Sequence, residues 1–379
     1  MWQSLHDAWW RLATQSHPHT FSDVLACRAL QSGSVVYGAA VAIRNAAYDR
    51  GWLRQKGLPC RVVSVGNLTV GGTGKTACVE LIAKKLIAMG HRAAVLSRGY
   101  GGPRRDYWLR WEADHLTVNG ASHAVSDGLA DEPQLLARRL PGVPVLVGPR
   151  RDRSGERACR EFAADVVILD DGFQYRRVQR ECDIVLIHAR TPFGGWAVLP
   201  RGPMREPLSS LSRAHIIMIT KADEALETLG ALGERLRSFN PDAAFVTATH
   251  EPTGLLEVMT GHLHDPKRLS GLRVGLLSSI GDPQGFEATV RRLHAMVLWH
   301  HTYPDHHRYH AADWAAIVGG GQGGRPDAIV TTEKDWVRLQ PLTQHREAVR
   351  SPLWVLQVQM KVLSGEDVLD ARLARLCAR

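Results

Sequence analysis

The sequence predicts an α/β protein whose strands form a mainly parallel sheet. Its 379 residues can hold two domains or one large one, and 44% hydrophobic with 22% charged residues is typical of a globular chain. Short apolar, β-branched runs alternate with stretches of helical periodicity, which is the pattern of a parallel sheet covered on both faces. One Gly-rich segment also lies directly between a predicted strand and a predicted helix.

The predicted elements of the first half are buried strands with helices between them. The strands are short apolar runs: Arg61–Gly66, Ala93–Ser97, Val143–Val147, Asp165–Leu169 and Asp183–His188. The helices are Thr76–Met89, Pro133–Leu140 and Arg153–Ala163. A second α/β pattern follows, with strands Ala214–Thr220, Ala243–Thr249, Arg273–Ile280, Met296–His300, Asp327–Thr332 and Pro352–Val358.

These elements predict four parts of the chain. Residues 1–57 are expected to be helices, and residues 58–190 a nucleotide-binding core. Residues 191–210 are rich in Gly and Pro and are expected to form a hinge or structured loop. Residues 211–379 should form a second, smaller α/β domain, in which residues 319–324 (GGGQGG) suggest a flexible insertion.

The N-terminal part has neither a signal-peptide pattern nor 18 uninterrupted apolar residues. Val35–Ala47 nevertheless has an apolar face, and Trp2, Trp9, Trp10 and Trp52 add aromatic surface. Such a helix can lie in a membrane interface, and the alternative is a helix docked on its own domain.

Charge and cysteine usage limit the partners. The net charge is +9, and basic residues cluster at 98–105, 150–160 and 176–180, which favours a polyanionic partner such as phosphorylated small molecules or an anionic membrane surface. The six cysteines form no C-x-x-C pair, which argues against a zinc ribbon and fits a reducing compartment.

The Gly-rich segment predicts a phosphate-binding loop of the P-loop NTPase type. Its glycines allow backbone N–H groups to turn toward phosphate oxygens, and the following helix directs its positive end at the same anion. Lys75 should reach the β- and γ-phosphates, and the Thr76 hydroxyl should ligate Mg²⁺. Thr69 stands where the usual pattern has Gly. The predicted nucleotide-binding residues are Thr69, Val70, Gly71, Gly72, Thr73, Gly74, Lys75 and Thr76.

Acidic residues stand where such a loop needs them. Asp170 and Asp171 end an apolar strand, and an Asp at this position holds the Mg²⁺ shell in P-loop enzymes, although a turn cap is the alternative. Asp131 precedes a helical run, so it is either an acceptor-activating carboxylate or only an N-cap. His306 and His307 are either functional or a structural histidine cluster.

Several motifs, taken in order, resemble one family, the tetraacyldisaccharide 4′-kinases of lipid A biosynthesis. The motifs are Gly66–Thr76 (GNLTVGGTGKT), Ser97–Gly102 (SRGYGG), Asp131–Pro133 (DEP), Leu169–Gln174 (LDDGFQ), Leu199–Pro207 (LPRGPMREP), Pro304–His307 (PDHH) and Thr332–Asp335 (TEKD). No single motif is decisive, but their number and order across most of the chain are specific.

The resemblance implies transfer of the ATP γ-phosphate to the 4′-hydroxyl of a tetraacylated glucosamine disaccharide 1-phosphate. It implies that Asp131 is the general base, oriented or assisted by His306. We further expect these two residues to come from different domains that close on the acceptor. Glu132 and Asp171 would then belong to the Mg²⁺ and phosphate site. Arg151 and Arg205 would stabilise charge, and Tyr100 would lie near the nucleotide or the acceptor.

The resemblance also implies a peripheral enzyme at the cytoplasmic face of the inner membrane, with a lipid disaccharide substrate and an anionic membrane surface as partners. We expect a monomer with no nucleic-acid partner. Two positions depart from the family pattern, because Tyr175 stands where His is usual and Ala77 where Pro or Ser is common. A tyrosine cannot carry a positive charge, which puts a catalytic role at 175 in doubt.

Two alternative functions come from other classes. Residues 220–223 (TKAD) resemble the [NT]-K-x-D element by which GTPases recognise guanine, although residues 170–172 (DDG) lack the D-x-x-G spacing of a GTPase switch. A nucleic-acid-binding ATPase would explain the basic charge, but the sequence contains no aromatic–basic recognition motif.

Overall fold

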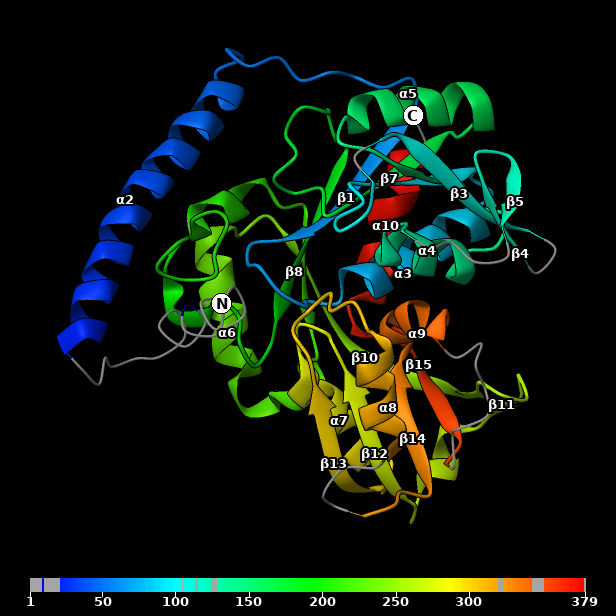
Figure 1. The fold of residues 1–379 in the computed structure, drawn as a ribbon. Coiled ribbons are helices and arrows are strands. Elements are labelled where there is room, and N and C mark those ends of the chain that lie inside the picture. Colours follow the sequence, from blue (N-terminus) through cyan, green and yellow to red (C-terminus); the bar gives the residue numbers. More distant parts are fainter. Residues whose placement is uncertain are drawn as a thin grey trace. The chain divides into compact units, whose positions relative to one another are not determined.

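The computed structural model describes residues 9, 21–103, 105–112, 115–123, 128–319, 324–342 and 351–377 (Figure 1). The chain forms two compact units. Unit 1 comprises Met1–Arg98, Val143–Thr249 and Met360–Arg379, and unit 2 comprises Gly99–Gly142 and His250–Gln359. The chain therefore passes from one unit to the other four times, twice within the long strands β10 (Ala244–Glu257) and β15 (Leu353–Ser364).

This division differs from the boundary expected at residues 191–210, which lie inside unit 1. The strands on either side of that segment, β8 (Cys182–His188) and β9 (Ile216–Thr220), are parallel neighbours in one sheet. Phe193 and Met204 are buried in the core of the same unit, so the segment is a packed loop and not a hinge. Residues 99–142, expected in the first domain, belong to unit 2.

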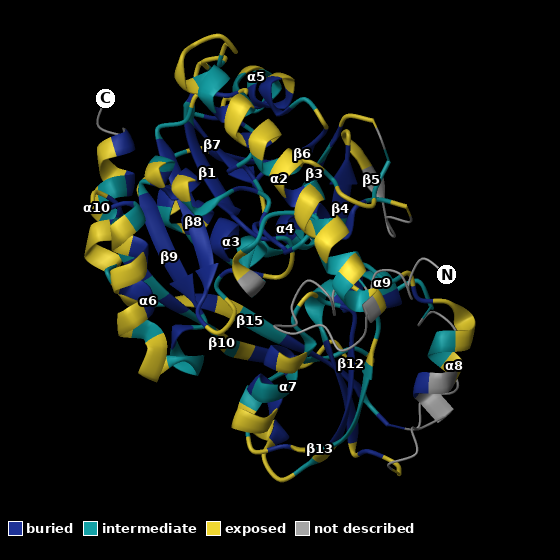
Figure 2. Ribbon diagram, turned by 90° about the vertical axis from the view of Figure 1, so that its left-hand side faces the viewer, coloured by how far each residue is buried: buried dark blue, intermediate teal, exposed yellow. Residues whose placement is uncertain are grey.

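The sheet of unit 1 is parallel and buried on both faces. Its strands run in the order β9-β8-β1-β7-β2-β6, and the first part of β10 pairs with β9. Figure 2 shows these strands in dark blue, as expected when helices cover both faces. The remaining strands are β1 (Arg61–Asn67), β2 (Ala93–Ser97), β6 (Val145–Val147) and β7 (Val166–Asp170).

The helices of unit 1 include one from the C-terminal end of the chain. They are α3 (Lys75–Ala88), α5 (Arg151–Phe162), α6 (Leu226–Phe239) and α10 (Glu366–Cys377), with 3₁₀ turns η1 (Gly194–Trp196), η2 (Leu208–Arg213) and η3 (Ala222–Glu224). The Lys85 ammonium of α3 lies 2.7 Å from the carboxylates of both Glu366 and Asp370. These ion pairs fasten α10 to the helix that follows the Gly-rich loop.

Helix α2 (Phe21–Asp49) docks on unit 1 through polar contacts and leaves an apolar face uncovered. The Ser34 hydroxyl donates to the Val198 carbonyl (2.7 Å), and the Asn45 amide donates to the buried Glu206 (3.1 Å). The apolar side chains on its open face are 63–71% exposed: Leu25, Val35, Val36 and Ile43.

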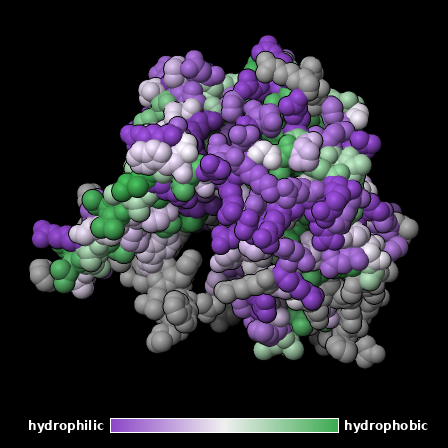
Figure 3. Space-filling view, turned by 90° about the horizontal axis from the view of Figure 1, so that it is seen from above, coloured by the Kyte–Doolittle hydropathy of each residue, from purple (hydrophilic) through white to green (hydrophobic). Residues whose placement is uncertain are grey.

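Helix α2 therefore docks on its own unit, as one alternative predicted, and also keeps the exposed apolar face on which the other alternative depends (Figure 3). By length and composition alone, Ser22–Asp49 could also cross a membrane. The sequence criterion of 18 uninterrupted apolar residues missed this helix because charged residues interrupt it, although its mean hydropathy is high enough. Helices were expected throughout residues 1–57. Most of the first twenty residues, including Trp2 and Trp10, lie outside the described part of the chain.

Unit 2 contains two groups of strands, one parallel and one antiparallel. The parallel strands are β12 (Arg273–Ser278), β13 (Met296–Thr302), β14 (Ala328–Thr332) and β15, and β11 (Leu263–His264) pairs antiparallel with β10. The antiparallel strands β3 (Tyr107–Glu112), β4 (His115–Val118) and β5 (Ala121–His123) were not predicted. The helices are α4 (Asp131–Arg139), α7 (Pro283–Arg292), α8 (Ala311–Gly319), α9 (Glu333–Leu339) and the 3₁₀ turn η4 (Pro266–Leu269). The expected Gly-rich insertion lies mostly outside the described residues.

Candidate active site

The Gly-rich loop of unit 1 joins strand β1 to helix α3, which confirms the predicted strand–loop–helix arrangement. Gly71 and Gly74 have φ angles of 113° and 84°, a backbone region that side chains disfavour, and Gly74 caps the N-terminus of α3. Gly71 and Gly72 are exposed, so the loop is open to a ligand. The positive end of α3 and the loop amides are therefore available to an anion.

Lys75 and Arg205 converge on Asp171 beside this loop. The Lys75 ammonium lies 3.3 Å from the Asn67 side-chain oxygen and 3.6 Å from Asp171. Arg205 donates two hydrogen bonds to the Asp171 carboxylate (2.7 and 2.8 Å). Burial raises the pKa of Asp171, but the Arg205 hydrogen bonds and the Lys75 charge outweigh it and hold that pKa well below its usual value. Asp171 is therefore a permanent carboxylate that orients two cations.

Arg151, the first residue of α5, completes the basic surroundings of the loop. Its guanidinium is buried and donates to the carbonyls of Asp170 and Asp171, both at 3.0 Å. The Tyr175 ring lies under this guanidinium (4.1 Å), and the Tyr175 hydroxyl donates to Asp152 (2.9 Å). Tyr175, which stands where the family pattern has His, thus packs against Arg151 while its hydroxyl is held by Asp152.

Thr76 and Asp170 offer oxygen donors that suit Mg²⁺. Asp170 ends β7 opposite Val65 of β1, at the same sheet edge as the loop, and accepts a hydrogen bond from the Ser97 hydroxyl (3.0 Å). Thr76 is half-buried in the first turn of α3. Within the described ranges, no group of three or more His, Cys, Asp or Glu side chains is arranged so that it could hold a metal ion by itself. The donor set therefore fits an Mg²⁺ ion that takes its other ligands from phosphate and water.

Buried donors around the loop also favour an oxygen-rich ligand. Within the described part of the chain, four such atoms have no hydrogen-bond partner: Asn67 Nδ2, Thr73 Oγ1, Arg151 Nε and Arg205 Nε. Unpaired buried atoms also occur elsewhere in the described residues, so these four are compatible with a ligand that supplies acceptors but do not identify one.

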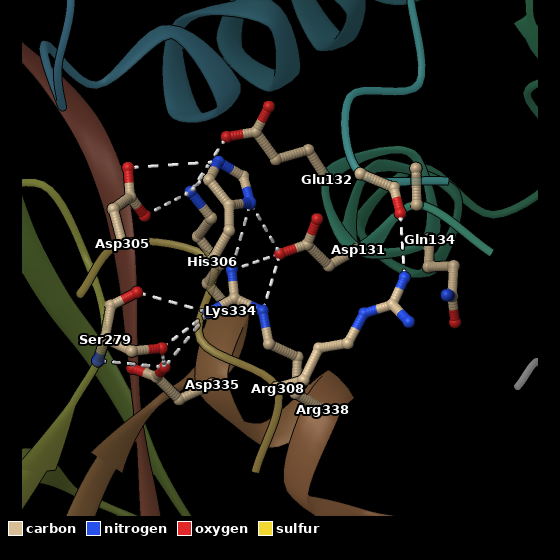
Figure 4. Close-up of polar contacts among 12 residues, drawn as sticks. Asp131, Glu132, Gln134, Ser279, Asp305, His306, Arg308, Lys334, Asp335 and Arg338 are labelled. Carbon is tan, nitrogen blue, oxygen red and sulfur yellow. Dashed lines mark hydrogen bonds and ion pairs between the residues drawn. The ribbon is translucent and has the colours of Figure 1, made fainter. Parts of the chain in front are cut away.

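Asp131 and His306 lie together in unit 2 (Figure 4). His306 Nδ1 is 3.2 Å from Asp131 Oδ2, and the Tyr100 and His306 rings are 5.2 Å apart. The expectation that this pair meets by closure of two domains is wrong, because both residues belong to one unit. The N-cap of α4 is Ala130, so Asp131 is the first helical residue and does not serve as the cap.

Arg338 is the site residue that sequence reasoning missed. Its Nε donates to Asp131 Oδ2 (2.7 Å), and its Nη2 contacts the same oxygen. Its Nη1 donates to the Ser279 hydroxyl (2.6 Å). Burial raises the pKa of Asp131, but the His306 hydrogen bond and the Arg338 and Lys334 charges hold it far below its usual value.

The TEKD motif organises this cluster. Thr332 caps α9 by accepting from the Asp335 amide (3.1 Å), and the fully buried Asp335 accepts from the Ser279 and Tyr309 hydroxyls (2.5 and 3.0 Å). Asp335 and Arg338 are one helical turn apart. The motif therefore fixes the direction from which Arg338 approaches.

Lys334 of the same motif binds Glu132, one of the predicted metal ligands. Its ammonium lies 3.0 Å from Glu132 and 3.2 Å from Asp305. Burial lowers the pKa of Lys334, but the Glu132 and Asp305 charges outweigh it and raise that pKa above its usual value. Glu132 is thus paired within unit 2, whereas Thr76, Asp170 and Asp171 lie in unit 1.

Replacing Arg338 by Gln tests this arrangement. Without the guanidinium the pKa of Asp131 should rise, so the acidic limb of the pH–activity profile should move to higher pH. We expect kcat to fall about 10-fold as Asp131 loses its orientation. The profile is measured beside Arg291→Gln, an exposed arginine of the same unit. An unshifted acidic limb would return Arg338 to a purely structural role.

The parallel sheet, the loop and the Asp at the adjacent strand end together define a fold of the P-loop kinase type. The sequence model of the family described as Tetraacyldisaccharide-1-P 4′-kinase matches residues 26–378. The chain belongs to this family.

Relatives and a solved structure support the assignment. A tetraacyldisaccharide 4′-kinase from Anaeromyxobacter dehalogenans is 40% identical over 375 residues, which cover 98% of this chain and 94% of that one. One from Syntrophus aciditrophicus is 40% identical over 342 residues, 88% of each chain. A crystal structure of LpxK from Aquifex aeolicus in complex with ATP is similar with a TM-score of 0.71 and 26% identity, covering 93% of this chain and 99% of that one.

Family membership decides among the functional classes weighed from the sequence. The chain is a kinase, so the regulatory GTPase suggested by residues 220–223 is the wrong class. The Thr220 hydroxyl of that element donates to the Thr73 carbonyl (3.1 Å), which places the element beside the Gly-rich loop.

Proposed function

We propose that this protein transfers the γ-phosphate of ATP to the 4′-hydroxyl of a tetraacylated glucosamine disaccharide 1-phosphate. The observation that carries the proposal is the open loop before α3, with Lys75 and Arg205 aligned by one carboxylate. The names of the relatives and the ATP in the Aquifex aeolicus structure support the same reaction.

In this proposal the residues of unit 1 bind the triphosphate. The amides of residues 69–76 and the Lys75 ammonium hold the phosphate oxygens, while Arg151 and Arg205 offset the charge that develops during transfer. Thr76 and Asp170 would hold Mg²⁺, with Asp171 beside them. Bound there, Mg²⁺ would neutralise phosphate charge. Glu132 remains a metal ligand only if it leaves Lys334.

Asp131 would accept the proton of the acceptor hydroxyl. Its contacts with His306 and Arg338 all engage Oδ2, and within the described part of the chain no hydrogen bond engages Oδ1. Oδ1 is therefore the oxygen offered to the acceptor. Because its pKa is strongly lowered, Asp131 is a weak base toward the acceptor hydroxyl. Its main contribution would therefore be to orient that hydroxyl and to accept the proton late, when the loose transition state releases it.

The decisive experiment uses γ-labelled ATP and a tetraacyl disaccharide 1-phosphate in detergent, followed by location of the label on the sugar. We expect label at the 4′ position that depends on the lipid. Release of labelled inorganic phosphate at the same rate with and without the lipid would contradict the proposal.

We further propose a peripheral, monomeric protein at the cytoplasmic face of the inner membrane, attached to its anionic surface. The open face of α2 and the net charge of +9 support this location.

Replacing Val36 and Ile43 together by Ser should weaken binding to anionic vesicles about 10-fold or more, since each buried apolar side chain contributes roughly 1.5–3 kcal/mol. Vesicle co-sedimentation measures the effect. Leu226→Ser and Met296→Ser, in comparably exposed apolar positions on other elements, serve as the control. Equal binding by the two variants would assign vesicle attachment to another surface.

A further inference from the structure

The turn that carries His306 is strained at His306 itself. Residues 304–307 form a tight turn, which the His307 amide closes by donating to the Pro304 carbonyl (3.0 Å). His306 is the third residue of this turn and has a φ angle of 62°, in the left-handed region. That region favours glycine, because in other residues the β-carbon comes too close to the following carbonyl oxygen. His306 therefore keeps this backbone conformation only if its surroundings hold it there.

The strained conformation sets the direction of the His306 ring. Figure 4 shows this ring directed at Asp131, with Nδ1 at 3.2 Å from Asp131 Oδ2. The other ring nitrogen, Nε2, lies 3.5 Å from the Lys334 ammonium. Because the backbone angles set the direction in which a side chain leaves the chain, relaxation of residue 306 to a negative φ would turn the ring away from Asp131.

The chain before His306 is anchored by two contacts. The Tyr303 amide donates to the carbonyl of Ser278, the last residue of β12 (2.8 Å). The Asp305 carboxylate lies 3.2 Å from the Lys334 ammonium. These contacts fix the N-terminal side of the turn, so its conformation depends on what fixes the C-terminal side.

A carboxylate of α8 fixes the residue after His306. His307 Nε2 lies 3.1 Å from Asp313 Oδ2, which also accepts from the His310 amide (2.8 Å). Burial raises the pKa of Asp313, but the hydrogen bonds from the His310 amide and the His307 ring outweigh it and hold that pKa below its usual value. Asp313 is therefore an ionised acceptor near neutral pH, and His307 Nε2 carries the hydrogen of this bond.

Two tyrosine rings hold the His307 ring in place. His307 stacks on Tyr303, with ring centroids 4.6 Å apart and planes inclined by 19°. Tyr309 meets the same ring edge-on at 5.2 Å, and it is itself buried, with its hydroxyl donating to Asp335 (3.0 Å). The His307 ring cannot turn without breaking both ring contacts and the hydrogen bond to Asp313.

We infer that His307 and Asp313 are positioning residues that keep His306 in its left-handed conformation, with its ring on Asp131. The inference rests on the proposed function, in which Asp131 offers Oδ1 to the acceptor while His306 occupies Oδ2. His307 and Asp313 act on the reaction through His306 alone. The second histidine of the PDHH motif thus has a role distinct from that of the first.

Replacing His307 by Phe keeps the ring contacts but removes the hydrogen bond to Asp313. We expect kcat to fall about 10-fold because His306 leaves Asp131, whereas KM for ATP should stay near the wild-type value. Asp313→Asn weakens the same hydrogen bond from its other end and should also lower kcat. His262→Phe, at an exposed histidine of unit 2, should leave kcat unchanged. An unchanged kcat in both His307→Phe and Asp313→Asn would overturn the inference.

A double-mutant cycle separates a positioning role from a purely structural one. In a chain that carries His306→Ala, the further change His307→Phe should alter kcat less than about twofold, since the residue through which it acts is gone. A structural role would lower kcat by the same factor with and without His306, and that result would also overturn the inference.

Crystal structures of His307→Phe and Asp313→Asn provide a readout that does not depend on phosphate transfer. We expect a negative φ at residue 306 and a ring displaced from Asp131. A φ angle still near 62°, with the ring still on Asp131, would contradict the inference. If the wild type phosphorylated no tetraacyl disaccharide 1-phosphate while these variants showed the expected change, the proposed function would fail and the positioning of His306 would stand.

Discussion

Replacing Asp131 by Asn is expected to lower kcat by about 10²–10⁴-fold, the usual contribution of a positioned base. Asn keeps the shape of the side chain but lacks the negative charge that orients the acceptor hydroxyl and accepts its proton. Asp131 makes its contacts with His306 and Arg338 in unit 2, away from the Gly-rich loop in the chain, so the Kd for ATP should stay near the wild-type value. Steady-state kinetics and equilibrium ATP binding measure both quantities.

Asp242→Asn is the matched control, because Asp242 is exposed and the same change removes the same charge. The variant should also keep its fold, which a thermal melt checks. Turnover within about threefold of wild type would remove Asp131 from the reaction and leave it as an ion-pair partner of Arg338.

Replacing Lys75 by Met should lower kcat by about 10²–10³-fold and weaken ATP binding as well. The ammonium lies at the start of α3 and is held by Asn67 and Asp171, in a position to follow charge as it moves onto the transferred phosphate. Removal of one such preorganised donor usually costs this much in rate. Unlike Asp131→Asn, this change should therefore affect both ATP affinity and turnover.

Lys84→Met provides the comparison, since Lys84 is exposed on the same helix and forms an ion pair with Glu80 (2.7 Å). Normal kinetics of Lys84→Met with a large loss in Lys75→Met would support the phosphate role. An equal, small effect of both changes would mean that the loop amides alone hold the triphosphate.

The buried strands were the most predictable part of the fold. Strand β2 has the predicted bounds Ala93–Ser97, and β7 and β8 differ by one residue at their ends. Strands buried on both faces appear in the sequence as continuous apolar runs, which need no tertiary information to identify. Strands β3 and β4 have mixed burial, and none of the short strands β3 to β5 carries such a run, so they were missed.

The division into units could not be predicted from composition. Gly and Pro between residues 191 and 210 suggested a boundary, but Phe193 and Met204 anchor this segment in the core of unit 1. The true division follows strands β10 and β15, which continue from one unit into the other without any change in local pattern. Gly and Pro in the sequence indicate turns, whereas the unit to which a segment belongs depends on contacts between residues far apart in the chain.

The loop and its acidic partners were predictable because each lies within a few residues of a strand end. Arg338 was not, because it stands 207 residues after the carboxylate that it binds and is one of many surface-type arginines in the sequence. The link through Ser279, Asp335 and α9 exists only after folding. The spacing of Asp335 and Arg338 on one helix was the only local signal.

The attachment of α10 to α3 has a consequence for synthesis of the protein. Lys85, in the helix that follows the Gly-rich loop, emerges from the ribosome 281 residues before Glu366, one of the two acidic residues with which it pairs. Since unit 1 includes the segment Met360–Arg379, it cannot complete its core until that segment has been made. A nascent chain that stops before this segment would thus lack support for a nucleotide-binding region encoded almost three hundred codons upstream.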